Sequence, residues 1–167
     1  MPWFNQLGHY FKTFNLFYMN TKNSNLPFIE LRSVQSEFPK VKISDSVQAA
    51  NFIRQFYSGD IDIFESSFIL LLNRQNLTIG FAKLSQGGIN STIVDPRIVA
   101  HYAVKALATS VILCHNHPSG NLQPSDNDLA LTKKVHAGLQ LLDINLLDHI
   151  ILTSEGSHSI TDNEGIS

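Results

Sequence analysis

Short apolar runs and amphipathic stretches follow one another along most of this 167-residue chain. The segments 68–72 (FILLL) and 111–114 (VILC) are continuously apolar over the length of a strand, which is typical of strands buried on both faces. A polar turn at 73–76 separates the first of them from an extended segment at 77–84, so the pattern predicts a β-hairpin. A later strand is predicted at 149–152.

Helices are predicted between these strands from their start signals. Apolar residues recur at helical spacing as far as about residues 57, 107 and 142. Because strands and helices alternate, the pattern indicates a layered α/β fold. Each helix starts at a residue type that is favoured at the N-cap: Ser44 or Asp45, Asp95 (followed by Pro96) and Ser125.

The pattern changes near residue 40. We expect residues 1–40 to form an N-terminal extension that is partly disordered or loosely packed, with a short strand at 27–32. Its first 18 residues are rich in aromatic side chains, and Met19 is an alternative start of the chain. Residues 41–167 hold the alternating strands and helices and are predicted to form a single domain.

Composition narrows the function classes. With 12 Lys and Arg against 14 Asp and Glu, the net charge of −2 gives no basic excess for phosphates, so we expect no direct nucleic-acid binding. One cysteine excludes an internal disulfide framework and fits a reducing, cytoplasmic setting. No apolar run approaches the roughly 20 residues of a membrane helix.

The segment 115–128 (HNHPSGNLQPSDND) carries the candidate chemistry. It directly follows a buried strand, and residues two apart on an extended backbone point to the same side, so His115 and His117 can converge. Asp128 lies in the first turn of the helix that Ser125 opens. Two imidazoles and a carboxylate can hold Zn²⁺ and leave a fourth position for a water, whose pKa then falls to about 7.

Each of these residues also has a structural interpretation. Two histidines in a His-x-His pattern at a strand end are often ordinary surface or packed residues rather than ligands. Ser125-x-x-Asp128 is a capping-box pair, which explains Asp128 by the start of a helix. Cys114 ends an apolar strand and is interpreted as an inert buried thiol rather than a ligand. We interpret His149 as a core histidine whose nitrogens are hydrogen-bonded within the protein. The alternative is a residue beside the ligands that adjusts the properties of the metal site. The residues alone therefore leave the metal interpretation open.

A hydrolytic metal site also needs a general base for the water proton. Glu65 is the best candidate, because it lies just before the 68–72 strand, which could neighbour the strand that precedes His115. The alternative is an ordinary exposed acid, and Glu30 and Glu37 are weaker choices because they precede the predicted core.

The composite motif His115-Asn-His-Pro-Ser-Gly, then Pro124-Ser125 and Asp128, resembles the metal motif of JAB/MPN (JAMM) metalloproteases, and its wording is similar to that of the RadC family. The resemblance covers about residues 41–165. It implies a three-layer α/β/α sandwich of the cytidine-deaminase-like JAB/MPN fold with a mixed central sheet. It also implies one Zn²⁺ bound by His115, His117 and Asp128, with Glu65 activating water and Ser125 helping to polarise the scissile carbonyl or its oxyanion.

Two features depart from that family. Many relatives carry an acid in the second hairpin strand, where this chain has Lys83. Longer RadC proteins also carry a DNA-binding helix-hairpin-helix module, for which residues 1–40 are too few, so the family's "DNA repair" label finds no support in this sequence.

The leading hypothesis is a zinc-dependent hydrolase that cleaves an amide bond, in a peptide or an isopeptide, of an unidentified peptide or protein substrate. The alternative is a non-catalytic RadC-like JAB module that acts in DNA repair or mobile-element processes. The presence of Lys83 motivates this alternative.

Overall fold

The computed structural model describes residues 34–57, 59–87 and 93–165. Residues Ser36–Ser167 form one compact unit. The strand predicted at 27–32 and most of the predicted N-terminal extension lie outside the described residues. None of the helices among the described residues combines the length and the apolar character that a membrane span requires.

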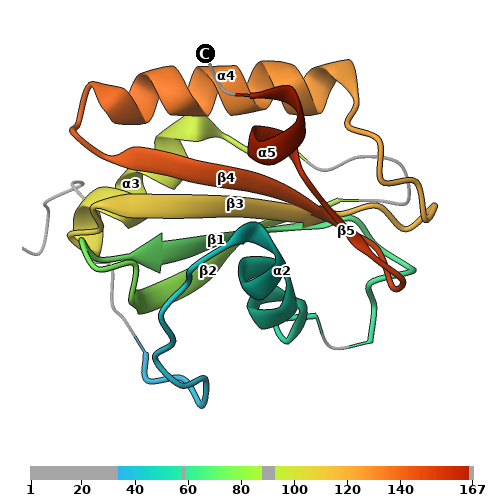
Figure 1. Cartoon of the computed structure of the whole chain (residues 1–167), viewed down its shortest axis with the longest axis horizontal. Helices are drawn as coiled ribbons and strands as arrows, with labels where there is room; N and C mark the ends of the chain where they lie inside the picture. The colour runs from blue at the N-terminus through green and yellow to red at the C-terminus, as the bar shows by residue number, and fades with distance from the viewer. Residues whose placement is uncertain (1–33, 58, 88–92, 166–167) are drawn as a thin grey trace, which may run out of the picture. The chain divides into compact units, whose positions relative to one another are not determined.

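A five-stranded mixed sheet in the order β2-β1-β3-β4-β5 forms the centre of this unit (Figure 1). β1 pairs antiparallel with both β2 and β3, β3 pairs parallel with β4, and β4 pairs antiparallel with β5. The predicted strands and the hairpin are confirmed, with slightly different ends. The strands are β1 (Ser66–Leu72), β2 (Thr78–Gln86), β3 (Ser110–Asn116), β4 (Asn145–Leu152) and β5 (Ser157–Ser159).

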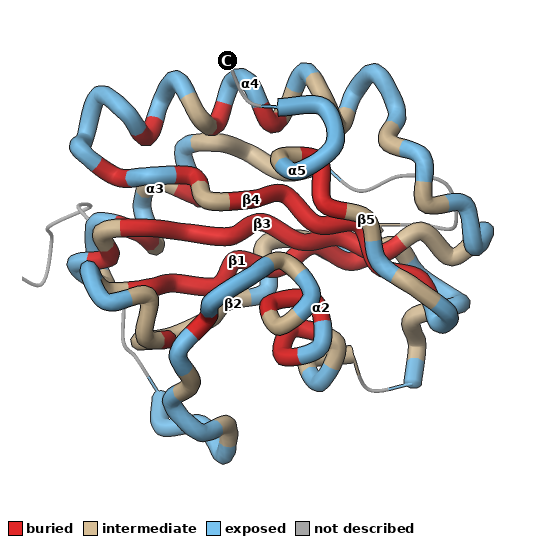
Figure 2. The backbone as a smooth tube through the Cα atoms, in the orientation of Figure 1, coloured by how far each residue is buried: buried red, intermediate tan, exposed pale blue. Residues whose placement is uncertain are grey.

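Helices cover both faces of the sheet, as Figure 2 shows by the buried strands between them. α2 (Ser46–Arg54) packs on one face with Phe68, Leu70, Ile112 and Cys114, and we call this the α2 face. α3 (Pro96–Lys105) and α4 (Asp126–Gln140) pack on the other, the α3/α4 face, with Ile69, Leu71, Val111 and Leu113. Every residue of β1 and β3 is buried, because both faces are covered. The α/β/α sandwich that the resemblance implies is confirmed.

The predicted helix starts are confirmed by side-chain capping. Asp45 accepts a hydrogen bond from the Gln48 amide, and Asp95 accepts one from the Arg97 amide, with Pro96 in the first turn of α3. These bonds satisfy amides that have no partner within the helix. Ser125 caps α4, which crosses the sheet between the parallel strands β3 and β4.

The helices end earlier than the apolar spacing predicts. α3 stops at Lys105, and Leu107 takes a positive φ of 54°, a conformation that terminates a helix, with its side chain 84% exposed. α4 stops at Gln140. Val47, in the first turn of α2, is exposed to solvent although it is apolar. A short helix that the sequence did not reveal, α5 (Ile160–Glu164), follows β5.

Candidate metal centre

Two histidines project from the carboxyl end of β3 toward the α3/α4 face. Val111 and Leu113 belong to the apolar cluster on that face, and His115 follows with the same alternation. His117 comes just after the strand, where its amide still hydrogen-bonds to the Leu152 carbonyl of β4 at 2.9 Å. The strand thus aims both imidazoles at the same point, as the i, i+2 spacing predicts.

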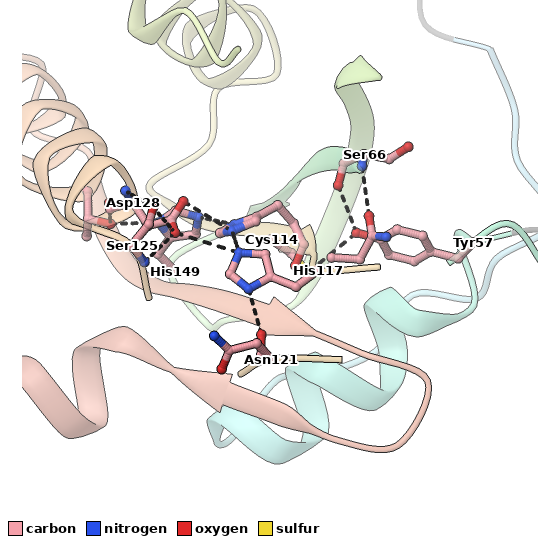
Figure 3. A network of polar contacts seen from close by, with 11 residues as sticks. Tyr57, Ser66, Cys114, His117, Asn121, Ser125, Asp128 and His149 are labelled. Carbon is pink, nitrogen blue, oxygen red and sulfur yellow. Dashed lines mark hydrogen bonds and ion pairs between the residues drawn. The ribbon is translucent and has the colours of Figure 1, made fainter. Parts of the chain in front are cut away.

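The first turn of α4 brings Asp128 to the two histidines. One nitrogen of each histidine and one oxygen of Asp128 lie within 4.8 Å of one another, and we call these three residues the ligand cluster. His115 Nε2 is 2.9 Å from His117 Nε2 and 3.2 Å from Asp128 Oδ1, and His117 Nε2 is 3.7 Å from Asp128 Oδ2. Figure 3 shows that this network links the end of β3 to the start of α4.

Two atoms of the ligand cluster, His117 Nδ1 and Asp128 Oδ2, already form hydrogen bonds with neighbouring protein groups. His117 Nδ1 lies 2.7 Å from the Asn121 carbonyl oxygen, which can only accept, so this nitrogen carries a proton and the Nε2 of the neutral ring is a lone-pair donor to a metal (Figure 3). Asp128 Oδ2 accepts two hydrogen bonds from Ser125, from its amide at 2.8 Å and its hydroxyl at 2.6 Å. Lone pairs that converge in this way fit a cation, and the two nitrogens and one carboxylate fit Zn²⁺.

Electrostatics within the cluster couple its members. The Asp128 carboxylate, 3.7 Å from His117 Nε2, raises the pKa of His117 against the opposing effect of burial. Although burial raises the pKa of the Asp128 carboxyl, the neighbouring imidazoles of His115 and His117 outweigh this and lower the pKa far below the ordinary range. The carboxylate is therefore ionised throughout the neutral range, as a metal ligand must be.

Glu65 directly precedes β1, which pairs with β3, the strand that carries His115. β1 pairs with β3 so that Ser67 is opposite His115, which confirms the predicted neighbouring of the two strands. The negative charge of Glu65 contributes to the raised pKa of His117. Its role as general base stays a prediction.

Asn116, between the two histidines, fixes the backbone on both sides of Glu65. Its amide nitrogen donates to the carbonyl oxygens of Ile61 and Phe64 at 2.5 and 2.9 Å, and its amide oxygen accepts from the Ser66 amide at 2.7 Å. The side chain is completely buried. The strand that carries the histidines therefore also holds the segment that carries the candidate base.

Ser125 is engaged within the protein. Its hydroxyl donates to Asp128 Oδ2 and accepts from the Asp128 amide at 3.2 Å, which completes the capping box that the sequence predicts. This arrangement makes Ser125 a neighbour of the ligand cluster that orients Asp128. The predicted contact of Ser125 with a substrate carbonyl stays a prediction.

Lys83 lies on the opposite face of the sheet from the ligand cluster. It is paired with Phe68 across the hairpin, and its Nζ sits 5.6 Å from the centre of that ring, on the α2 face. Its ammonium donates to Gln86 Oε1 at 2.6 Å. An acid at this position would face away from His115 and His117, so Lys83 does not replace a group of this site.

Cys114 also points to the α2 face, buried in the core beside Tyr57, and burial raises the pKa of its thiol. The interpretation of this residue as a buried thiol away from the ligands agrees with this position.

Two residues beside the ligand cluster were not predicted as parts of the site. His149 Nε2 lies 2.9 Å from His115 Nδ1, and its Nδ1 lies 2.6 Å from the Thr132 hydroxyl. His149 is buried, as expected of a core histidine, and burial lowers its pKa to about 3, but its partner is a candidate metal ligand. Thr132 could have been found from its spacing, since it stands four residues after Asp128 on one helix face.

Comparisons with known proteins show the family to which this chain belongs. The sequence profile of the RadC-like JAB domain matches residues 43–166. A UPF0758 protein of Flavobacterium johnsoniae is 43% identical over 127 residues, which cover 76% of this chain and 55% of that protein. A UPF0758 protein of Porphyromonas gingivalis is 38% identical over 136 residues, covering 81% of this chain and 59% of that protein.

A third UPF0758 protein, from Trichodesmium erythraeum, is 40% identical over 138 residues, with 80% of this chain and 55% of that protein covered. The chain thus spans somewhat more than half the length of these relatives. The profile match extends over most of the sequence and contains every strand and helix described above. The chain belongs to the family of RadC-like JAB domain proteins.

Proposed function

We propose that this protein is a zinc-dependent hydrolase of the JAMM metallopeptidase type that cleaves an amide bond in a peptide or isopeptide. The observation that carries the proposal is the ligand cluster, in which two imidazole nitrogens and a carboxylate oxygen converge within 4.8 Å. Three protein ligands leave a tetrahedral metal with one open position, which distinguishes catalytic from structural zinc sites.

The chain supplies the remaining groups for hydrolysis. Bound Zn²⁺ would lower the pKa of a water to about 7 and polarise the carbonyl of the substrate. Glu65 would accept the proton of the attacking water and deliver it to the leaving amine. Ser125 would hold Asp128 through its amide and hydroxyl, and in the reaction its hydroxyl would turn to the developing oxyanion.

The substitution Glu65→Gln tests the hydrolytic step. It removes the proton acceptor at nearly constant volume and leaves the ligand cluster complete, so zinc content should stay unchanged. Hydrolysis should fall by about 10² to 10⁴-fold, the usual contribution of a general base. Wild type and variant would be screened in parallel on peptide, isopeptide and small amide substrates.

The outcome separates hydrolysis from the alternative of a non-catalytic JAB module. Cleavage by wild type that Glu65→Gln abolishes supports the proposal. Equal cleavage by both proteins would contradict the role of Glu65. Zinc-loaded wild type that cleaves none of these substrates would favour the non-catalytic module.

A further inference from the structure

A buried chain of hydrogen bonds connects the backbone carbonyl of Asp128, through Thr132 and His149, to His115. The Thr132 hydroxyl lies 2.6 Å from the Asp128 carbonyl oxygen and 2.6 Å from His149 Nδ1, and His149 Nε2 lies 2.9 Å from His115 Nδ1. Thr132, His149 and His115 are each 2–3% exposed. Two of the three members of the ligand cluster are therefore joined a second time, through α4 and β4.

We infer that Thr132 and His149 are positioning residues, which fix the tautomer of His115 so that its Nε2 presents a lone pair to the metal. This inference rests on the proposed metal centre but makes a separate statement about protons. It concerns the side of His115 that faces away from the other ligands.

The direction of each hydrogen bond follows from the first one. A backbone carbonyl can only accept, so the single hydroxyl proton of Thr132 points to the Asp128 carbonyl oxygen. The Thr132 oxygen then accepts from His149, whose Nδ1 must carry a proton. In a neutral ring this leaves His149 Nε2 as an acceptor, so His115 Nδ1 is the donor. His115 Nε2 is left without a proton.

The opposite arrangement would block the metal. If His149 carried its proton on Nε2, it would donate to His115 Nδ1, and the proton of His115 would move to Nε2, where it would face Asp128 Oδ1 at 3.2 Å. Burial of this chain of hydrogen bonds keeps solvent from substituting for any of these partners. The Thr132 hydroxyl thus determines which of the two arrangements forms.

The two histidine ligands are held by different means. His117 donates from Nδ1 directly to the Asn121 carbonyl oxygen in the loop after β3. His115 reaches a backbone carbonyl only through His149 and Thr132, and that carbonyl belongs to Asp128. A shift of the first turn of α4 would therefore disturb the Asp128 carboxylate and the His115 tautomer together.

NMR of isotope-labelled imidazole nitrogens in the metal-free wild-type protein tests the inference directly. At about pH 8, above the ordinary imidazole pKa of about 6.5, we expect His149 to carry its proton on Nδ1 with a bare Nε2. His115 should carry a proton on Nδ1. A proton on His149 Nε2 would overturn the inference, and this measurement requires no variant to fold.

A pair of substitutions at Thr132 tests the consequence for the metal. Thr132→Val removes the hydroxyl at similar size, so zinc affinity, measured by competition with a chromophoric chelator, should fall about 10 to 100-fold, as for other outer partners of metal-bound histidines. Thr132→Ser keeps the hydroxyl and should retain the affinity and the tautomers. Equal zinc affinity of the two variants would overturn the inference.

The results separate this inference from the proposed function. Wild type with the expected tautomers but without zinc affinity would support the positioning role of Thr132 and His149 and contradict the metal centre. Wild type that binds zinc with the proton on His149 Nε2 would overturn this positioning role, and the proposed metal centre would still hold.

Discussion

At the scale of single residues, the ligand cluster combines groups that have different charge states at neutral pH. Asp128 is ionised, because its contacts with His115 and His117 lower its pKa, whereas the nearby Asp128 carboxylate raises the pKa of His117. A proton and a metal ion therefore compete for the same nitrogen of His117. Metal binding should release that proton, since only the neutral imidazole is a ligand.

The affinity for zinc should consequently fall as the pH falls, beginning above pH 6.5, the ordinary value for histidine. The sign follows from the raised pKa, because His117 is protonated at a higher pH than a free imidazole. Once the pH is below that pKa, the affinity should drop by about tenfold per pH unit for one displaced proton. Chelator competition at several pH values measures it. An affinity that stays constant down to about pH 6 would contradict the coupling.

At the scale of elements, one strand end organises both halves of the site. β3 carries the two histidines on the α3/α4 face, while Asn116 between them holds the segment that leads into β1. α4 adds Asp128 through the capping box that begins the helix. The position of the site therefore follows from three local structures: the end of β3, the segment before β1 that Asn116 holds by hydrogen bonds, and the start of α4.

Asn116→Asp should lower the free energy of unfolding by at least about 2 kcal/mol. The change replaces two amide protons with a carboxylate oxygen that faces the carbonyls of Ile61 and Phe64 in a fully buried position. Asn73→Asp is the matched control, because Asn73 uses only its side-chain oxygen, as acceptor for the Gln75 and Leu77 amides. Denaturant unfolding compares the two variants, and equal free energies of unfolding would contradict this role of the Asn116 side chain.

At the scale of the whole molecule, the sheet separates two environments. The ligand cluster and its hydrogen-bond partners lie on the α3/α4 face, whereas Lys83, Phe68 and Cys114 lie on the α2 face. The fully buried strands β1 and β3 stand between them. Changes of charge on the α2 face should therefore have little effect on the metal centre.

Lys83→Glu tests this separation, since it replaces the positive charge at this position with a negative one. We expect zinc affinity to stay within about twofold of wild type and stability within about 0.5 kcal/mol, as for an exposed substitution. Lys83→Gln controls for loss of the positive charge alone. A tenfold gain in zinc affinity or in hydrolysis for the glutamate variant, absent from the glutamine variant, would contradict the separation.

The sequence predicted the parts of this architecture that depend on local signals. The apolar runs defined the strands, and Asp45, Asp95 and Ser125 marked the helix starts, because an N-cap depends on a few neighbouring residues. The contact of His149 with His115 was not predictable in this way, because it depends on the register that places Leu113 opposite His149 in the parallel pair β3–β4. The early end of α3 at Lys105 follows from the left-handed conformation of Leu107, which no residue preference announces.

The zinc content of the purified protein tests the central claim most directly. Elemental analysis of wild type should find about one zinc per chain, and His117→Ala, which removes one of three ligands, should lose nearly all of it. His101→Ala, at an exposed histidine of α3 outside the cluster, should keep the wild-type content. Wild type without bound zinc after exposure to the metal, or equal zinc content in His117→Ala and wild type, would contradict the assignment of this site.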